Sequence, residues 1–179
     1  MVVFLDLDSV LVDFRGGINK VFKLTPSSRP KEKGGTVWNW YRDYGITDEE
    51  FNEVCTEEFW HNLNWMQDGQ RILSLLEQRI PKGVIYLLTM PMPNKGSWTG
   101  KYLWVKDNMP GYTERLIVSS APKKLFAPGN LLVDDKDSNI DEFILSGGKA
   151  ILVPRPWNRW GLTYTNVDHI GKQLNKLGF

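Results

Sequence analysis

Short continuous apolar runs recur along the chain, separated by stretches with helical spacing. Five such runs stand at 2–5, 84–88, 116–118, 131–133 and 150–153. They are continuous and mostly aliphatic or β-branched rather than alternating with polar residues, which is typical of strands covered on both faces of a parallel sheet. The pattern therefore predicts a sheet that lies between layers of helices.

Amphipathic stretches between these runs predict the covering helices. Helical spacing is found at 68–80, 97–108, 137–148 and about 167–177. Asp68 and Asp137 are candidate N-caps, and Pro81 marks the end of the first of these helices. Strands that alternate with helices in this order form right-handed βαβ units. We therefore expect an α/β fold with a doubly wound, Rossmann-like parallel sheet.

One segment interrupts the alternation, because no convincing strand pattern lies between the first apolar run and the second. Residues 14–23 carry apolar side chains at helical spacing, and 47–59 begins with Thr47 and Glu50, which form a capping-box pattern. Ligands of open α/β sheets bind beyond the carboxyl ends of the strands, so an insertion here would roof that site. We predict a core domain of residues 1–13 and 67–179 and a small helical cap of residues 14–66.

The charge balance excludes a general polyanion binder. The 179 residues include 22 basic and 21 acidic ones, for a formal net charge of +1, so bulk attraction to nucleic acid or acidic membranes is not expected. No apolar stretch approaches the ~20 residues of a membrane span, and the first residues lack the basic region of a signal peptide. We expect a cytoplasmic protein with no nucleic-acid polymer and no membrane as partner.

Cysteine and histidine add little chemistry. Cys55 is the one cysteine, and its helical spacing from Phe51 and Phe59 predicts a buried structural thiol. His61 and His169 lack the paired spacing of a zinc site, and we expect both to be ordinary surface or cap residues.

Acidic, hydroxyl and basic side chains follow the predicted strands at their carboxyl ends. In chain order they are Asp6 and Asp8, Thr89, Lys123 and Lys124, and Asp134 and Asp135. A parallel sheet brings these ends to one edge, so residues distant in sequence converge there. Crowded carboxylates become tolerable when a divalent cation lies among them, and a hard cation such as Mg²⁺ takes oxygen ligands. The sequence therefore predicts a metal site at this edge.

The stretches that carry these residues resemble those of a known superfamily. "DLDSVLVDF", "LLTMP", "APKK" and "LLVDDKDS", in this order, are similar to the four motifs of haloacid dehalogenase-like phosphatases. The longer start "DLDSVLVDFRGGINKVF", with "GKYLWVKDN" and the double Asp, resembles more narrowly the 5′(3′)-deoxyribonucleotidase family. That family usually has glycine where this chain has Ser9, at a turn that benefits from the backbone freedom of glycine.

The resemblance implies a reaction and a role for each residue. Asp6 would be the nucleophile that forms an aspartyl-phosphate, and Asp8 the general acid and base. Thr89 and Lys124 would bind the phosphate, with Lys124 preferred over Lys123 by the family's spacing. Mg²⁺ would be held by Asp6, the backbone carbonyl of Asp8 and Asp135, with Asp134 in support.

The substrate implied is a small-molecule nucleoside monophosphate, whose base would stack on aromatic side chains. Phe14, beside the first motif, is the first candidate for that contact by the family pattern, followed by Trp38 and Trp40. Phe59 and Trp60 are expected in the core of the cap. A homodimer is compatible with the sequence, which leaves the oligomeric state open.

Three functions remain after these arguments. The first is a Mg²⁺-dependent phosphatase for deoxyribonucleoside 5′-monophosphates. The second is a phosphatase for another small phosphate ester, such as a sugar phosphate, although an aromatic and weakly charged cap suits a base better. The third is a catalytically idle module of the same fold that binds a nucleotide or a protein. The complete set of expected catalytic groups argues against it.

Overall fold

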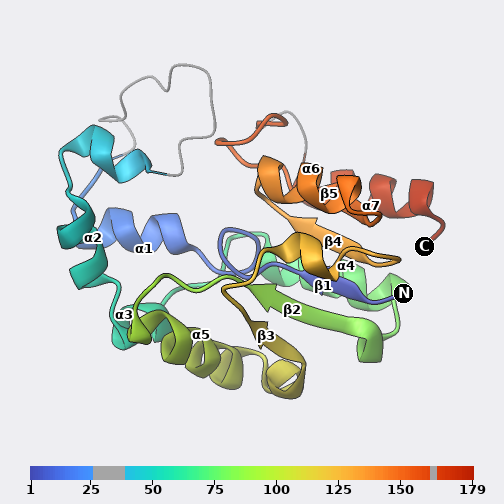
Figure 1. Cartoon of the computed structure of the whole chain (residues 1–179), viewed down its shortest axis with the longest axis horizontal. Coiled ribbons are helices and arrows are strands. Elements are labelled where there is room, and N and C mark those ends of the chain that lie inside the picture. Colours follow the sequence, from blue (N-terminus) through green and yellow to red (C-terminus); the bar gives the residue numbers. More distant parts are fainter. Residues whose placement is uncertain (26–38, 162–164) are drawn as a thin grey trace.

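The computed structural model, which describes residues 1–25, 39–161 and 165–179, contains a five-stranded, all-parallel sheet (Figure 1). Its strands are β1 (Val3–Leu5), β2 (Ile85–Thr89), β3 (Leu116–Val118), β4 (Leu131–Asp134) and β5 (Lys149–Leu152). Their order is β3-β2-β1-β4-β5, which makes β1 the central strand. Val3 lies opposite Ile85 of β2 on one side and Leu131 of β4 on the other.

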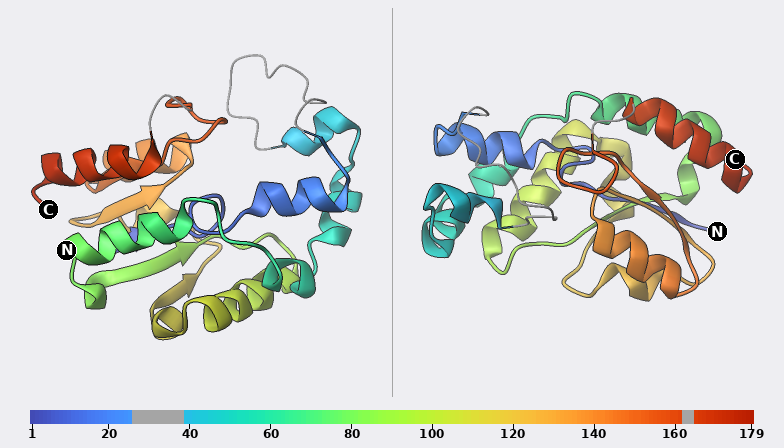
Figure 2. Two further views of the ribbon diagram at one scale, coloured as in Figure 1. Left: turned by 180° about the vertical axis from the view of Figure 1, so that it is seen from behind. Right: turned by 90° about the horizontal axis from the view of Figure 1, so that it is seen from above.

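Helices cover both faces of this sheet. The long ones are α4 (Gly69–Arg79), α5 (Lys95–Asn108), α6 (Asp137–Leu145) and α7 (Asn166–Leu177). Val3 and Leu5 belong to the hydrophobic cluster that α4, α5 and α7 complete, whereas Phe4 packs with Phe143 of α6 in a second cluster. Successive side chains of a strand point to opposite faces, which explains this division. Figure 2 shows α4 and α7 side by side on one face and α6 on the other. The predicted doubly wound α/β fold is confirmed.

A short 3₁₀ turn precedes each of three strands. They are η3 (Lys82–Val84) before β2, η4 (Pro110–Arg115) before β3 and η5 (Lys123–Phe126) before β4. The last of these turns carries a lysine into the site described below.

The segment between β1 and α4 is helical where the structure describes it. It contains α1 (Phe14–Val21), η2 (Trp40–Tyr44), α2 (Asp48–Val54) and α3 (Glu57–His61), which lie beyond the carboxyl ends of the strands (Figure 1). Gly100 lets α3 approach α5, because a Cβ atom there would lie 2.5 Å from Trp60 Cβ. The division of the chain into a core and a cap at residues 14–66 stays a prediction.

Several local predictions are confirmed and others are wrong. Thr47 and Glu50 form the capping box: Glu50 N–H donates to Thr47 Oγ1 and Thr47 N–H donates to Glu50 Oε2. The helical pattern predicted at 47–59 forms two helices, because α2 ends at its C-cap Cys55 and Thr56 is the N-cap of α3. Cys55 is buried, as expected, and burial raises the pKa of its thiol to about 12.

The carboxylates of the two aspartates predicted as N-caps pair with arginine side chains. Asp68 precedes α4, but its side chain makes no capping hydrogen bond and instead accepts two from Arg155, at 2.8 and 3.0 Å. Asp137 is the first residue of α6 rather than its cap, and its carboxylate pairs with Arg159 at 3.3 Å. The N-cap position predicted for Asp68 is confirmed, although its side chain bonds to Arg155 instead of capping the helix. The prediction for Asp137 is wrong, because Lys136 is the N-cap of α6. Within the described residues, no helix has the length and apolar character needed to cross a membrane.

Candidate active site

The loop after β1 places Asp6 and Asp8 at the centre of the sheet's carboxyl edge. Asp6 N–H donates to Val133 O at 2.9 Å, which continues the pairing of β1 with β4. The chain then turns sharply at Ser9, whose N–H donates to Val12 O at 2.7 Å. Ser9 has φ of +62°, in the left-handed region that favours glycine. The resemblance noted above has glycine here for the same backbone reason.

Three buried carboxylates meet at this edge. Oxygen atoms of Asp6, Asp134 and Asp135 lie within 4.8 Å of one another. Asp134 Oδ1 accepts from Lys136 N–H at 2.7 Å and its Oδ2 from Asn139 Nδ2 at 2.9 Å, so protein donors already occupy this side chain. The cluster has the oxygen donors that a divalent metal ion requires.

The lysine that reaches the cluster is Lys123, not the expected Lys124. Lys123 Nζ lies 2.6 Å from Asp6 Oδ1 and 2.6 Å from Asp134 Oδ2, and its side chain is 4% exposed. Lys124 is 44% exposed and pairs with Glu142 on α6 at 3.2 Å. The expectation for Lys124 is therefore corrected: the η5 turn after Pro122 directs the first lysine inward and the second outward.

Burial and mutual repulsion change the acidity of the cluster. Burial, with the charges of Asp134 and Asp8, raises the pKa of Asp6 to about 7 even though Lys123 lowers it. Burial also raises the pKa of Asp135, with Asp134 and Asp6 adding to the effect and the hydrogen bond from Trp157 opposing it. Carboxylates that resist ionisation together are stabilised in the charged form by a cation, so these residues fit a divalent ion.

A second buried lysine, which the sequence analysis missed, joins Asp8 to Thr89. Lys101 of α5 pairs with Asp8 Oδ2 and donates to Thr89 Oγ1 at 2.9 Å and to Met90 O at 2.8 Å. Asp8 Oδ1 is buried and makes no hydrogen bond within the described chain. Helical spacing in the sequence could have identified Lys101 as buried, since it lies on the buried face of α5 with Trp104 and Val105.

These groups line a pocket of about 480 Å³ that is also lined by aromatic side chains. Asp6, Asp8, Lys123 and Asp135 line it, and the aromatic side chains are Phe14, Trp40, Tyr41, Phe51 and Trp60. Thr89 is not among the lining residues and is 1% exposed, but Lys101 connects it to Asp8. The structure thus brings the acidic, basic and aromatic candidates together from separate parts of the chain.

The aromatic candidates divide according to their contacts. Phe14 lines the pocket and stacks on Trp60, with ring centroids 4.7 Å apart and planes 2° apart. Trp40 lines it too and is 5% exposed. Trp38 lies outside the described residues. Trp60 is buried as predicted, but it also faces the pocket, so a core residue of the cap is part of the candidate site.

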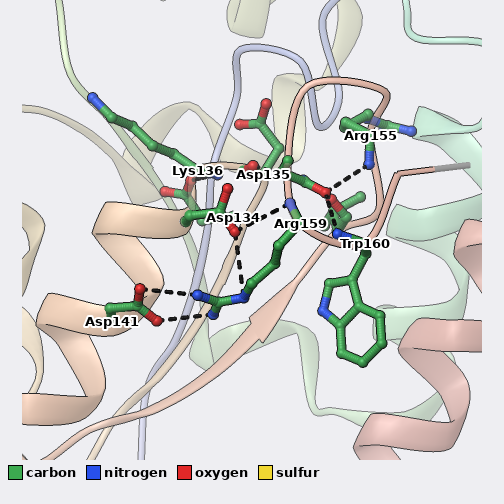
Figure 3. Close-up of polar contacts among 10 residues, drawn as sticks. Asp134, Asp135, Lys136, Asp141, Arg155, Arg159 and Trp160 are labelled. Carbon is green, nitrogen blue, oxygen red and sulfur yellow. Dashed lines mark hydrogen bonds and ion pairs between the residues drawn. The ribbon is translucent and has the colours of Figure 1, made fainter. Parts of the chain in front are cut away.

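The loop after β5 reaches back to the site, which the sequence analysis did not foresee. Trp157 Nε1 donates to Asp135 Oδ2 at 2.6 Å, and Asn158 Nδ2 donates to Asp135 O at 2.8 Å. Figure 3 shows this loop beside Asp134 and Asp135, with Arg159 turned away to pair with Asp141 of α6. No periodicity or motif marked this loop, because irregular backbone leaves no repeating pattern in a sequence.

The histidines take no part in the site. His61 is partly exposed, and its Nε2 lies 2.7 Å from Asp107 Oδ2. His169 was expected to be a surface or cap residue, but it is buried beside Trp160, with the two ring centroids 5.0 Å apart. Burial, with Lys176 and Lys172, lowers its pKa.

Comparison with known proteins identifies the chain. The sequence model of a family described as "5' nucleotidase, deoxy (Pyrimidine), cytosolic type C protein" matches residues 1–170. The chain belongs to this family. A relative of this nucleotidase is a protein of Vibrio phage KVP40 described as "Putative 5'(3')-deoxyribonucleotidase", which is 30% identical over 140 residues, or 77% of this chain and 68% of the relative.

Solved structures share the fold of this nucleotidase at low sequence identity. An L-2-haloacid dehalogenase matches with a TM-score of 0.54 at 12% identity and covers 98% of both chains. A Had-superfamily hydrolase from Ehrlichia chaffeensis matches with a TM-score of 0.52 at 15% identity, over 98% of this chain and 96% of that one. The family and the fold together make this chain a phosphoric monoester hydrolase of the nucleotidase type.

Proposed function

We propose that this nucleotidase is a Mg²⁺-dependent phosphatase that hydrolyses deoxyribonucleoside 5′-monophosphates through an aspartyl-phosphate on Asp6. The observation that carries the proposal is the composition of one pocket, which is lined by buried carboxylates, a buried lysine and several aromatic rings. The charged groups suit a phosphoryl group and the aromatic rings suit a base.

Asp6 and Asp8 divide the chemistry between them. Asp6 Oδ attacks phosphorus, the bond from phosphorus to the ester oxygen breaks, and Asp8 supplies the proton to the departing nucleoside. Asp8 then accepts a proton from the water that hydrolyses the aspartyl-phosphate, and Asp6 is regenerated with release of phosphate. Asp8 Oδ1 supports this role, because it has capacity for a bond that the described residues do not supply.

Lysine and threonine hold the transferring group. Lys123, already 2.6 Å from Asp6 Oδ1, neutralises negative charge as the phosphoryl group moves. Thr89 binds a phosphoryl oxygen, and Lys101 fixes its hydroxyl relative to Asp8. Phosphoryl transfer requires mainly positioning and charge stabilisation, which these groups supply.

The carboxylates of Asp6 and Asp135, with the backbone carbonyl of Asp8, would hold the Mg²⁺ ion. Asp134 would act in support, in keeping with its bonds to Lys123, Lys136 and Asn139. When bound, the ion neutralises negative charge on the phosphate and on the crowded carboxylates.

A panel of phosphate esters tests the substrate class. Phosphate release should be faster for deoxyribonucleoside 5′-monophosphates than for ribonucleotides, 3′-monophosphates and sugar phosphates, and a chelator should abolish it. Stacking of a base is worth roughly 1–3 kcal/mol, so a sugar phosphate without a base should lose about 10-fold or more in kcat/KM. Equal rates for sugar phosphates would contradict the assignment to nucleotides.

Replacement of Asp6 tests the nucleophile. Asp6→Asn should lower turnover by roughly 10³-fold or more, because the amide cannot form the aspartyl-phosphate. Asp43→Asn is the matched control, since Asp43 is exposed and does not line the pocket. Turnover of the folded Asp6→Asn variant within 10-fold of the unmodified chain would exclude the covalent route.

A further inference from the structure

The loop that follows β5 contacts both segments that carry the catalytic carboxylates. On the β4 side, Trp157 donates to the side chain of Asp135 and Asn158 donates to its backbone carbonyl, at 2.6 and 2.8 Å. On the β1 side, Arg155 Nε donates to Ser9 O at 2.6 Å and its Nη2 to Val10 O at 3.3 Å. One short loop therefore ties the two segments together.

The loop itself is firmly held. Arg155 is 3% exposed and binds both carboxylate oxygens of Asp68, at 2.8 and 3.0 Å. Asn158 is 8% exposed and also donates to Val153 O at 2.8 Å. A group that orients a catalytic side chain must have little freedom of its own, and these contacts provide that restraint.

The indole ring of Trp157 is fixed as well. Trp157 is 8% exposed, and the guanidinium carbon of Arg15 lies 4.2 Å from the centroid of its ring. The same guanidinium lies 5.0 Å from the ring of Trp40 in the wall of the pocket. The ring is therefore held on one face while its N–H points to Asp135 Oδ2.

We propose that Trp157 is a positioning residue for Asp135: its ring N–H orients the carboxylate for Mg²⁺ binding. The inference rests on the proposed Mg²⁺ site. A carboxylate with one oxygen fixed loses less rotational freedom when its other oxygen binds a cation. Groups that hydrogen-bond metal ligands typically contribute 10–100-fold to metal affinity. Trp157 touches neither substrate nor metal in this assignment and acts through Asp135 alone.

Trp157→Phe tests this role because it keeps an aromatic ring beside Arg15 and removes only the N–H donor. Trp160→Phe is the matched control from the same loop, since the Trp160 ring packs beside His169. Titration calorimetry with Mg²⁺ on the metal-free proteins gives the affinity directly. Phosphate release at varied Mg²⁺ concentration gives the half-saturating concentration and kcat separately.

We expect Trp157→Phe to weaken Mg²⁺ binding by about 10–100-fold, while kcat at saturating Mg²⁺ stays close to that of the unmodified chain. Trp160→Phe should change neither quantity. Unchanged Mg²⁺ affinity in Trp157→Phe, or a lower kcat that Mg²⁺ does not restore, would overturn the inference. Absence of Mg²⁺ binding by the unmodified chain would overturn the proposed function instead, so the two failures are distinct.

A second pair of variants covers the case in which Trp157→Phe does not fold. Trp157→His keeps a ring N–H donor and Trp157→Met does not. Tighter Mg²⁺ binding by the His variant than by the Met variant supports the inference, and equal binding overturns it.

Discussion

The ammonium group of Lys123 lies between two buried carboxylates, and its charge has two consequences. Burial alone would lower the pKa of Lys123, but Asp134 and Asp6 outweigh it and raise that pKa. The lysine therefore stays charged, and it offsets part of the repulsion between Asp6 and Asp134. The same charge stands beside the proposed nucleophile, so one residue serves both stability and reaction.

Two adjacent lysines allow a direct test of this position. Lys123→Met should lower turnover at least about 100-fold and destabilise the fold by about 3–5 kcal/mol, because it leaves buried carboxylates without their partner. Lys124→Met should change stability by less than about 0.5 kcal/mol and leave turnover unchanged, since its bond to Glu142 is exposed. Thermal denaturation measures the change in stability and phosphate release measures the change in turnover. A larger effect of Lys124→Met than of Lys123→Met would contradict the assignment of Lys123 to the site.

Backbone strain at Ser9 gives a second prediction at this scale. A left-handed conformation costs an ordinary residue about 1–2 kcal/mol, and Ser9 has φ of +62°. Ser9→Gly should therefore stabilise the protein by about 1 kcal/mol, less any gain of freedom by glycine in the unfolded chain. Ser9→Ala removes the hydroxyl but keeps the strain, so it should give no gain. Urea denaturation measures both, and equal effects would assign the change to the hydroxyl.

At the scale of the elements, periodicity explains what the sequence could predict. Continuous apolar runs gave all five strands, and helical spacing gave α4 to α7, because these elements bury a regular pattern. Strand ends then placed Asp6, Asp8 and Asp135 at one edge. A 3₁₀ turn has no such pattern, so the spacing that favoured Lys124 could not show that η5 directs Lys123 into the site.

Long-range polar contacts could not be predicted from the sequence either. The roles of Arg155 and Trp157 depend on where the loop after β5 lies in space, which no local pattern encodes. Asp68 is a second example of a long-range contact that no local pattern predicts. It stands where a helix cap is expected, yet Arg155, from far along the chain, takes its carboxylate.

The two interpretations of Asp68 predict different effects of Asp68→Asn. Asn is as good a cap as Asp, so a capping role predicts almost no change. An ion pair with buried Arg155 predicts a loss of about 3 kcal/mol at pH 7, because the guanidinium loses its countercharge. We expect the larger loss, measured by chemical denaturation. A change below about 0.5 kcal/mol would favour the cap.

The pH dependence of this effect follows from the pKa of Asp68. Burial raises that pKa, but the hydrogen bond and charge of Arg155 outweigh burial and lower it below 3.8. A lowered folded-state pKa gives stability that is present above the unfolded pKa and is lost as pH falls through the folded value. The difference between the unmodified chain and Asp68→Asn should therefore shrink below about pH 4.

At the scale of the whole molecule, the acidic cluster links stability to pH and metal. The pKa of Asp6 is raised from 3.8 to about 7 by burial, so the metal-free folded chain holds this proton more tightly than the unfolded chain. The resulting stability is complete below 3.8 and is lost as pH rises to about 7. Mg²⁺ requires the deprotonated carboxylate and replaces the proton.

The stabilisation by Mg²⁺ should therefore grow with pH between about 4 and 7. Melting temperatures measured with Mg²⁺ and with a chelator across this range give the difference directly. Asp6→Asn, which cannot titrate at this position, should show a flatter dependence. A constant difference in the unmodified chain would contradict the link between Asp6 and the ion.

The central place of β1 in the sheet also affects how the chain is made. Val3 pairs with Leu131, so more than a hundred residues must be synthesised after β1 before its second neighbour exists. At about 5–20 residues per second, that interval is roughly 6 to 26 seconds. The apolar strand β1 has two open edges until β2 is made and one open edge from then until β4 is made, so it is exposed to other nascent chains throughout this interval. Synthesis that stalls before β4 should consequently yield aggregates or chaperone-bound chains rather than a stable partial fold.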